Sequence, residues 1–89
     1  MKYKLFLTKK GRDDLFAIEK IDQKRIADKL RFYLSNDNPL THAKKLKNSR
    51  LGTYRFRIGD YRAIFDIDKK VNITILLILK IKHRKDAYL

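Results

Sequence analysis

The stretch from Gly52 to Phe65 places the strongest constraint on the fold of this chain. It reads Gly-Thr-Tyr-Arg-Phe-Arg-Ile-Gly-Asp-Tyr-Arg-Ala-Ile-Phe, with apolar and basic side chains in alternation. A period of two is typical of strands with one buried face, and glycine in first position suits a two-residue type II′ turn. We therefore predict a β-hairpin that turns at Gly59-Asp60. The predicted register pairs Ile58 with Tyr61, Arg57 with Arg62, and Phe56 with Ala63.

This register gathers three arginines on one face of the hairpin. Arg55, Arg57 and Arg62 share that face, and Arg57 lies directly opposite Arg62. Like charges that oppose each other across a ladder destabilise an isolated sheet. A sequence that accepts this cost is expected to bind an anion on that face.

The composition indicates which kind of anion. The 89 residues suffice for one domain, residues 1–89, and 23 Lys and Arg against 10 Asp and Glu give a formal net charge of +13. Such a charge favours polyanions, although a solvated lysine-rich surface is the simpler alternative. The sequence shows no basic amphipathic membrane helix, no long apolar run, no signal peptide and no cysteine. We therefore expect a cytoplasmic protein that does not bind membranes.

Periodicity and capping residues predict the elements that precede the hairpin. In chain order these are a strand at 2–7, a helix at about 9–20 with Thr8 as N-cap, a helix from Asp22 as N-cap to about Leu34, a stop at 35–39, and a basic loop over 40–51 with room for a short helical turn. Because only a short link separates the two helices, they are expected to form a helical hairpin.

The last predicted strand runs from Val71 to about Ile81 and is apolar on both faces, which places it inside the sheet. A three-residue turn at 68–70 aligns its odd positions with the core face of the β-hairpin. This register puts Lys80 and Lys82 on the side of the arginines. The expected fold is α+β, with the helical hairpin packed on one face of a twisted, mostly antiparallel sheet of three or four strands.

An arginine-rich sheet face suits phosphate, because each guanidinium offers a planar fork of donors to two oxygens. Cleavage of RNA also requires groups that take and give protons and cations that stabilise the pentavalent transition state. No acidic pair or histidine cluster has metal-site spacing, so we expect neither metal nor cofactor. His83 and Tyr88 are the candidates for proton transfer. The candidate stabilisers are Arg55, Arg57, Arg62, Lys82 and Arg84.

Two segments flank the apolar last strand. They are Leu51-Gly52-x-Tyr54-Arg55-Phe56-Arg57-Ile58-Gly59-Asp60-Tyr61-Arg62-Ala63-Ile64-Phe65 and His83-Arg84-Lys85-Asp86-Ala87-Tyr88. Together they resemble the RelE side of the RelE/ParE toxin superfamily. The resemblance implies the toxin of a type II toxin–antitoxin pair, with an antitoxin as partner, that enters the ribosome and cuts mRNA without metal. In the implied reaction the 2′-OH attacks the adjacent phosphate, which leaves a 2′,3′-cyclic phosphate and a 5′-OH.

The resemblance also implies roles for individual residues. Arg57 and Arg62 hold the scissile phosphate, Lys82 is a further catalytic cation, and His83 or Tyr88 handles the proton. Where the family type has lysines, this chain has arginines, whose guanidinium groups hold their protons too tightly to act as bases. We therefore expect the hairpin to stabilise charge and the C-terminal segment to transfer the proton. The residues expected to contact RNA phosphates are Arg55, Arg84, Lys80, Lys44, Lys45, Lys47 and Arg50.

Two other functions stay open at the level of sequence. ParE-type relatives with the same fold inhibit DNA gyrase without any cleavage, and a fold alone does not separate the two activities. The basic residues together with Tyr88 favour cleavage, because a protein poison does not need them. A basic module that binds RNA and never cleaves it is the third alternative.

Overall fold

A computed structural model describes residues 2–47 and 52–86 of the chain. The elements, in chain order, are β1 (Lys2–Leu7), α1 (Lys9–Phe16), α2 (Lys20–Leu34), the short 3-10 helix η1 (Pro39–His42), β2 (Ala43–Lys45), β3 (Tyr54–Ile58), β4 (Tyr61–Lys69) and β5 (Ile73–His83). Within these residues, neither helix is long and apolar enough to cross a membrane.

The strands form one sheet in the order β1-β5-β4-β3-β2. β1 runs parallel to β5, and the other neighbours are antiparallel. The predicted α+β class with a mostly antiparallel sheet is confirmed, whereas the predicted count of three or four strands is wrong. The additional strand is β2, which lies in the segment that was expected to be a basic loop and pairs with β3.

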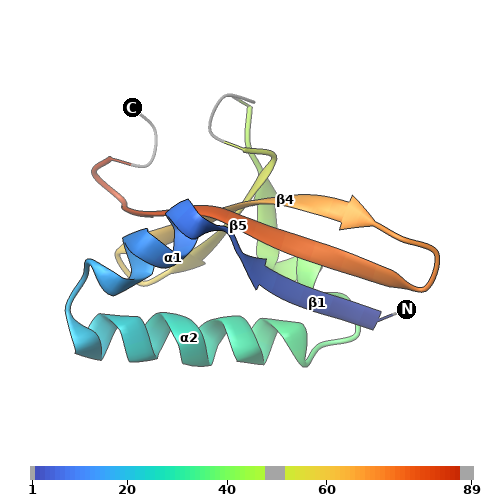
Figure 1. Cartoon of the computed structure of the whole chain (residues 1–89), viewed down its shortest axis with the longest axis horizontal. Coiled ribbons are helices and arrows are strands. Elements are labelled where there is room, and N and C mark those ends of the chain that lie inside the picture. Colours follow the sequence, from blue (N-terminus) through green and yellow to red (C-terminus); the bar gives the residue numbers. More distant parts are fainter. Residues whose placement is uncertain (1, 48–51, 87–89) are drawn as a thin grey trace.

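The two helices cover the same face of the sheet (Figure 1). Leu15 of α1 and Ile26 and Leu30 of α2 belong to the core cluster that also holds Phe56 and Leu76 of the sheet. Burial of these apolar side chains is the main force that holds the helical layer on the sheet. The opposite side of the sheet, which neither helix covers, is called the open face below.

The helix boundaries differ from the predicted ones. The first helix ends at Phe16 instead of Lys20, and the second begins at Lys20 with Glu19, not Asp22, as its N-cap. Asp22 lies in the first turn of α2. The side-chain amide of Gln23 donates to the Ile18 carbonyl at 2.8 Å and so satisfies a carbonyl in the turn between the helices. This contact from α2 holds the link in a non-helical path.

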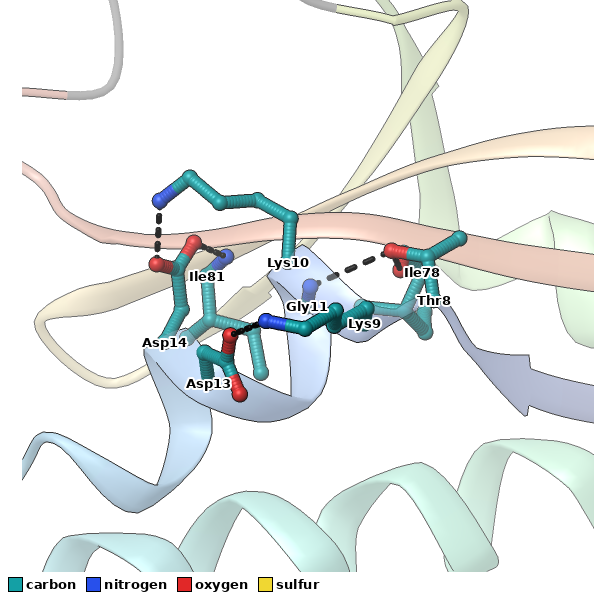
Figure 2. A network of polar contacts seen from close by, with 8 residues as sticks. All are labelled: Thr8, Lys9, Lys10, Gly11, Asp13, Asp14, Ile78 and Ile81. Atoms are coloured by element: carbon teal, nitrogen blue, oxygen red, sulfur yellow. Dashed lines mark hydrogen bonds and ion pairs between the residues drawn. The ribbon is translucent and has the colours of Figure 1, made fainter.

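Beyond the end of β1, the edge of β5 is contacted by Thr8 and the first turns of α1 (Figure 2). Thr8 accepts from the Gly11 amide at 3.1 Å as the predicted N-cap, and its hydroxyl donates to the Ile78 carbonyl at 2.8 Å. Farther along, Asp14 accepts from the Ile81 amide at 3.0 Å and also pairs with Lys10. The side chains of Thr8 and Asp14 thus satisfy backbone groups of β5 beyond the end of its pairing with β1.

Removal of the Asp14 carboxylate is expected to destabilise the fold. The Asp14→Ala variant leaves the Ile81 amide without its partner, and an unsatisfied buried amide costs about 1–3 kcal/mol of unfolding free energy. Urea unfolding followed by circular dichroism measures the change. Asp13→Ala is the matched control, because Asp13 only pairs with the exposed Lys9. Equal stability of the two variants would contradict the assigned role of Asp14.

A β-bulge in β5 overturns the predicted register of the last strand. Ile64 pairs with Lys80 and Phe65 with Ile78, so Leu79 has no partner in β4. Before the bulge the even positions face the core, as buried Leu76 and Ile78 show, and after it the odd position Ile81 does. The predicted core position of all odd residues is therefore wrong. Lys80 and Lys82 nevertheless lie on the side of the arginines, as predicted.

Candidate functional site

Basic side chains from four adjacent strands meet on the open face. The hairpin register is the predicted one, with Arg57 opposite Arg62 and Ile58 opposite Tyr61. Because directly paired residues share a face, the register defines two rows across the sheet. The first row is Lys82–Arg62–Arg57, and the second is Lys80–Ile64–Arg55–Lys44. The six basic residues of these rows are called the cationic face.

The turn at Gly59 brings Arg57 and Arg62 especially close. Gly59 has a φ of +59°, and among the described residues only glycines have a positive φ, so Asp60 does not. A positive φ at the first loop residue alone agrees with the predicted type II′ turn. In a two-residue hairpin the first flanking pair exchanges hydrogen bonds, so the next pair, Arg57 and Arg62, is of the closer, non-hydrogen-bonded kind. The two like charges are therefore held together by the shape of the turn.

Arg62 is buried although it has no acidic partner among the described residues. Arg62 is only 7% exposed. Its Nη1 donates to the carbonyls of Gly59 at 3.0 Å and Tyr61 at 2.9 Å. The Nε atoms of Arg62 and Arg55 are buried without a hydrogen-bond partner. Buried donors of this kind are costly unless a ligand satisfies them. Their presence is consistent with a site that is completed by an anion.

Asp66, an acidic residue of β4 on the open face, is already satisfied. Asp66 pairs with Leu77 on the open face and accepts from both the amide and the hydroxyl of Thr53 at 2.7 Å. Across residues 2–47 and 52–86, no ion pair involves a member of the cationic face. The cationic face is thus an uncompensated positive field with guanidinium forks at its centre, which suits phosphate oxygens.

His83 does not join the cationic face. It pairs with Tyr61, whose hydroxyl lies 3.5 Å from an Asp22 oxygen of α2, so both rings are on the helix side of the sheet. The ring of His83 packs edge-on to Tyr61 at 5.5 Å, and its Nδ1 accepts from the Lys85 amide at 3.2 Å. With Asp22, Ile26 and other residues it lines a hollow of about 230 Å³. Strand alternation therefore separates His83 from the arginines.

Tyr61 remains a neutral phenol in this hollow. Burial, and next the negative charge of Asp22, raise the pKa of Tyr61 above its ordinary value. A neutral Tyr61 donates its proton toward Asp22 and fixes the packing of the hairpin end on α2. It has no part in the cationic face.

The structure describes four of the remaining predicted residues, which are Lys44, Lys45, Lys47 and Arg84. Lys44, in the unpredicted strand β2, pairs with Arg55 and joins the second row, whereas Lys45 pairs with Tyr54 and points to the other face. Lys47 is exposed beyond β2. Arg84 lies at the hairpin turn, where its amide donates to the Asp60 carbonyl at 2.7 Å and its Nε is 3.7 Å from the Asp60 carboxylate. Arg50 and Tyr88 lie outside the described residues.

Sequence reasoning did not assign Tyr33 any part near the site. Its hydroxyl donates at 3.2 Å to the backbone carbonyl of Arg57, and its burial raises the pKa of the phenol. Its helical spacing predicted only a core position, which Tyr33 also occupies. Its hydrogen bond to Arg57 depends on the packing of α2 against the end of β3, and no pattern in the sequence predicts that packing.

In residues 2–47 and 52–86, no group of three or more His, Cys, Asp or Glu side chains is arranged to hold a metal ion.

Comparisons with known proteins place the chain in a family. A family model described as the ParE toxin of type II toxin–antitoxin system, parDE, matches residues 5–88. The chain is similar to a chain of the toxin–antitoxin complex RelBE2 from Mycobacterium tuberculosis, with 26% identity and a TM-score of 0.64 over 94% of this chain and 100% of that one. Its fold is also similar to a chain of the archaeal RelE–RelB complex from Pyrococcus horikoshii OT3, with 24% identity and a TM-score of 0.67 over 97% and 99%. A comparison with curated proteins found no significant match. The predicted resemblance is confirmed: the chain belongs to the RelE/ParE superfamily of toxins of type II toxin–antitoxin systems.

Proposed function

We propose that this toxin is an endoribonuclease that cleaves mRNA on the ribosome without a metal cofactor. The observation that carries the proposal is the row Lys82–Arg62–Arg57, which spans three strands and has no acidic partner among the described residues. A phosphate placed on this row meets the exposed guanidinium of Arg57, the ammonium group of Lys82 and the charge of the buried Arg62 between them. Cations preorganised in this way stabilise the extra negative charge of a pentavalent phosphorus.

In the proposed reaction the 2′-oxygen of one nucleotide forms a bond to the adjacent phosphorus as it loses its proton. The bond from phosphorus to the 5′-oxygen of the next nucleotide breaks, and that oxygen takes up a proton. Arg57, Arg62 and Lys82 hold the phosphate and neutralise the transition state. The resemblance implies that His83 or Tyr88 transfers the proton. We propose Tyr88 for this role, because His83 lies on the opposite side of the sheet.

The other basic residues extend the proposed contact along RNA. Arg55, Lys80 and Lys44 form the second row and bind the phosphates next to the scissile one. The remaining basic residues of the sequence prediction are proposed to contact ribosomal RNA through its phosphates. These residues are Lys45, Lys47, Arg50 and Arg84.

We further propose that an acidic segment of a cognate antitoxin covers the cationic face in the cytoplasm. Both similar solved structures are described as toxin–antitoxin complexes. An acidic chain on the two rows would neutralise the charge that RNA requires, so antitoxin and RNA would compete for one surface. The prediction of an antitoxin partner rests on the family, and its acidic character rests on the net charge of +13.

The function is tested with purified toxin and ribosomes that carry a defined mRNA. We expect cuts that leave a 5′-OH and a 2′,3′-cyclic phosphate, that require the ribosome and that persist in the presence of a chelator after ribosomes are stabilised with polyamine. Primer extension maps the cuts, and ligation specific for 5′-OH ends identifies the product. Arrest of bacterial growth on induction without any mRNA cut would contradict the proposal.

A gyrase inhibitor is the second candidate, and the ParE description of the matched family favours it. A supercoiling assay with purified gyrase decides between the two. Inhibition of supercoiling together with intact mRNA assigns the gyrase activity. Cleavage with unaffected supercoiling assigns the nuclease. Ribosome binding with neither effect would leave a non-cleaving RNA-binding module.

A further inference from the structure

An aromatic and basic patch lies outside the cationic face, where the end of α2 meets η1. Phe32 is 53% exposed, and its ring centroid lies 6.2 Å from that of the exposed His42. The Lys29 ammonium lies 5.1 Å from the centroid of the Phe32 ring. Lys29, Phe32 and His42 are called the aromatic patch. They leave an exposed pair of rings beside a positive charge.

The aromatic patch is supported from beneath by a buried stack of rings. His42 stacks on Tyr33 with centroids 4.8 Å apart, and Tyr33 stacks on Phe56 at 4.7 Å. Phe56 is fully buried in the core. The His42 ring is therefore held in one orientation with one of its faces packed on Tyr33. Such a fixed ring can accept a further ring without a large loss of side-chain entropy.

Tyr33 also connects the aromatic patch with the cationic face. The Arg57 carbonyl points away from β4, because Arg57 and Arg62 form a non-hydrogen-bonded pair, and β2 ends its pairing one residue earlier, at Phe56. The Tyr33 hydroxyl donates to this carbonyl at 3.2 Å. Tyr33, which supports the aromatic patch, thus contacts the backbone of the residue that ends the row Lys82–Arg62–Arg57. The patch lies on the helix side of the sheet and the Arg57 side chain lies on the open face, so an RNA strand that contacts both passes round the edge of β3.

We propose that the aromatic patch binds an unpaired RNA base next to the phosphate held by Arg57. The proposal rests on the proposed RNA-cleaving function and adds a base-stacking subsite to it. Any base presents a flat face to Phe32 or His42, and Lys29 supplies a charge for the accompanying phosphate. No acidic residue competes for Lys29 within the described chain, since both carboxylate oxygens of the neighbouring Asp28 are engaged by Lys24 and Arg31.

Phe16 shows that exposure alone does not define the subsite. It is 64% exposed at the end of α1, yet in the described residues no aromatic ring packs on it and no lysine or arginine lies over it. Phe16→Ala is therefore a matched control that removes an equally exposed ring outside the aromatic patch.

The experiment measures binding of dye-labelled single-stranded RNA by fluorescence anisotropy at fixed salt. A second RNA carries abasic sites and so keeps the phosphates but lacks bases. Phe32→Ala and His42→Ala are expected to weaken binding of the intact RNA by about 5- to 50-fold, with little effect on the abasic RNA. Phe16→Ala should change neither. Thermal melting confirms that each variant is folded before binding is compared.

Equal losses for intact and abasic RNA, or no loss at all, would overturn the subsite. Loss of antitoxin binding in Phe32→Ala with unchanged RNA binding would also overturn it, because the patch would then be a protein interface. Cleavage is measured separately from binding. Base-dependent binding without cleavage would refute the proposed nuclease while supporting the subsite, and cleavage without base dependence would do the reverse.

Discussion

The Arg62→Ala variant is expected to cleave ribosome-bound mRNA about 10²- to 10³-fold more slowly than the unchanged protein. Arg62 occupies the centre of the row Lys82–Arg62–Arg57, and its burial removes water that would otherwise weaken its field. Its hydrogen bonds to the Gly59 and Tyr61 carbonyls aim the guanidinium before a substrate arrives. Quantitative primer extension over a time course, at saturating toxin, measures the rate.

Two further variants show whether the loss reflects chemistry or charge. Arg62→Lys keeps the positive charge but loses the planar fork, so its rate should fall between those of the unchanged protein and Arg62→Ala. Arg12→Ala removes one positive charge from an exposed position of α1 and should leave the rate unchanged. If Arg12→Ala and Arg62→Ala slow cleavage equally, the effect is one of net charge, and the assigned role of Arg62 fails.

The Gly11→Ala variant is expected to lose about 3 kcal/mol of unfolding free energy. Alanine usually stabilises a helix by up to about 1 kcal/mol relative to glycine. At Gly11 the sign reverses, because a Cβ would lie 2.3 Å from the Ile78 carbonyl oxygen. That oxygen is fixed by the amide and the hydroxyl of Thr8, so the backbone of β5 has little freedom to move.

Gly59→Ala separates this steric effect from backbone strain. Gly59 has a φ of +59°, and nothing lies within 4 Å of the position that its Cβ would take. Its cost is therefore only the left-handed conformation, about 1 kcal/mol. Chemical denaturation of both variants compares the two costs. A smaller loss at Gly11 than at Gly59 would show that α1 can shift away from β5, and would contradict the close packing argued for this contact.

The hairpin could be predicted from sequence residue by residue, because two independent signals agree there. The alternation of Arg55, Arg57 and Arg62 with buried side chains fixes the face, and Gly59 fixes the turn. Strand β2 could not be predicted in the same way. Its three residues are too few to show a period, and β2 forms only because β3 offers an unpaired edge. Lys44 therefore joins the cationic face through tertiary pairing.

The predicted placement of side chains on the two faces of the sheet agrees with the structure only where strand alternation was followed. Alternation after Lys82 places His83 on the helix side, whereas the general suitability of histidine for proton transfer had favoured a catalytic part. The register of β5 failed for a different reason. Both faces of that strand are aliphatic, so hydrophobicity carries no information about which set of positions is buried.

The unpaired Leu79 has a consequence for comparing members of this superfamily. Counting in steps of two back from Lys82 would assign Ile78 to the open face, although Ile78 is fully buried against the helices. In a relative that lacks the extra residue, the basic residue that corresponds to Lys80 would directly follow the residue that corresponds to Ile78. A one-residue gap inside the last strand of an alignment would then keep the basic residues of the open face aligned, and an ungapped alignment would match a buried side chain to a member of the cationic face.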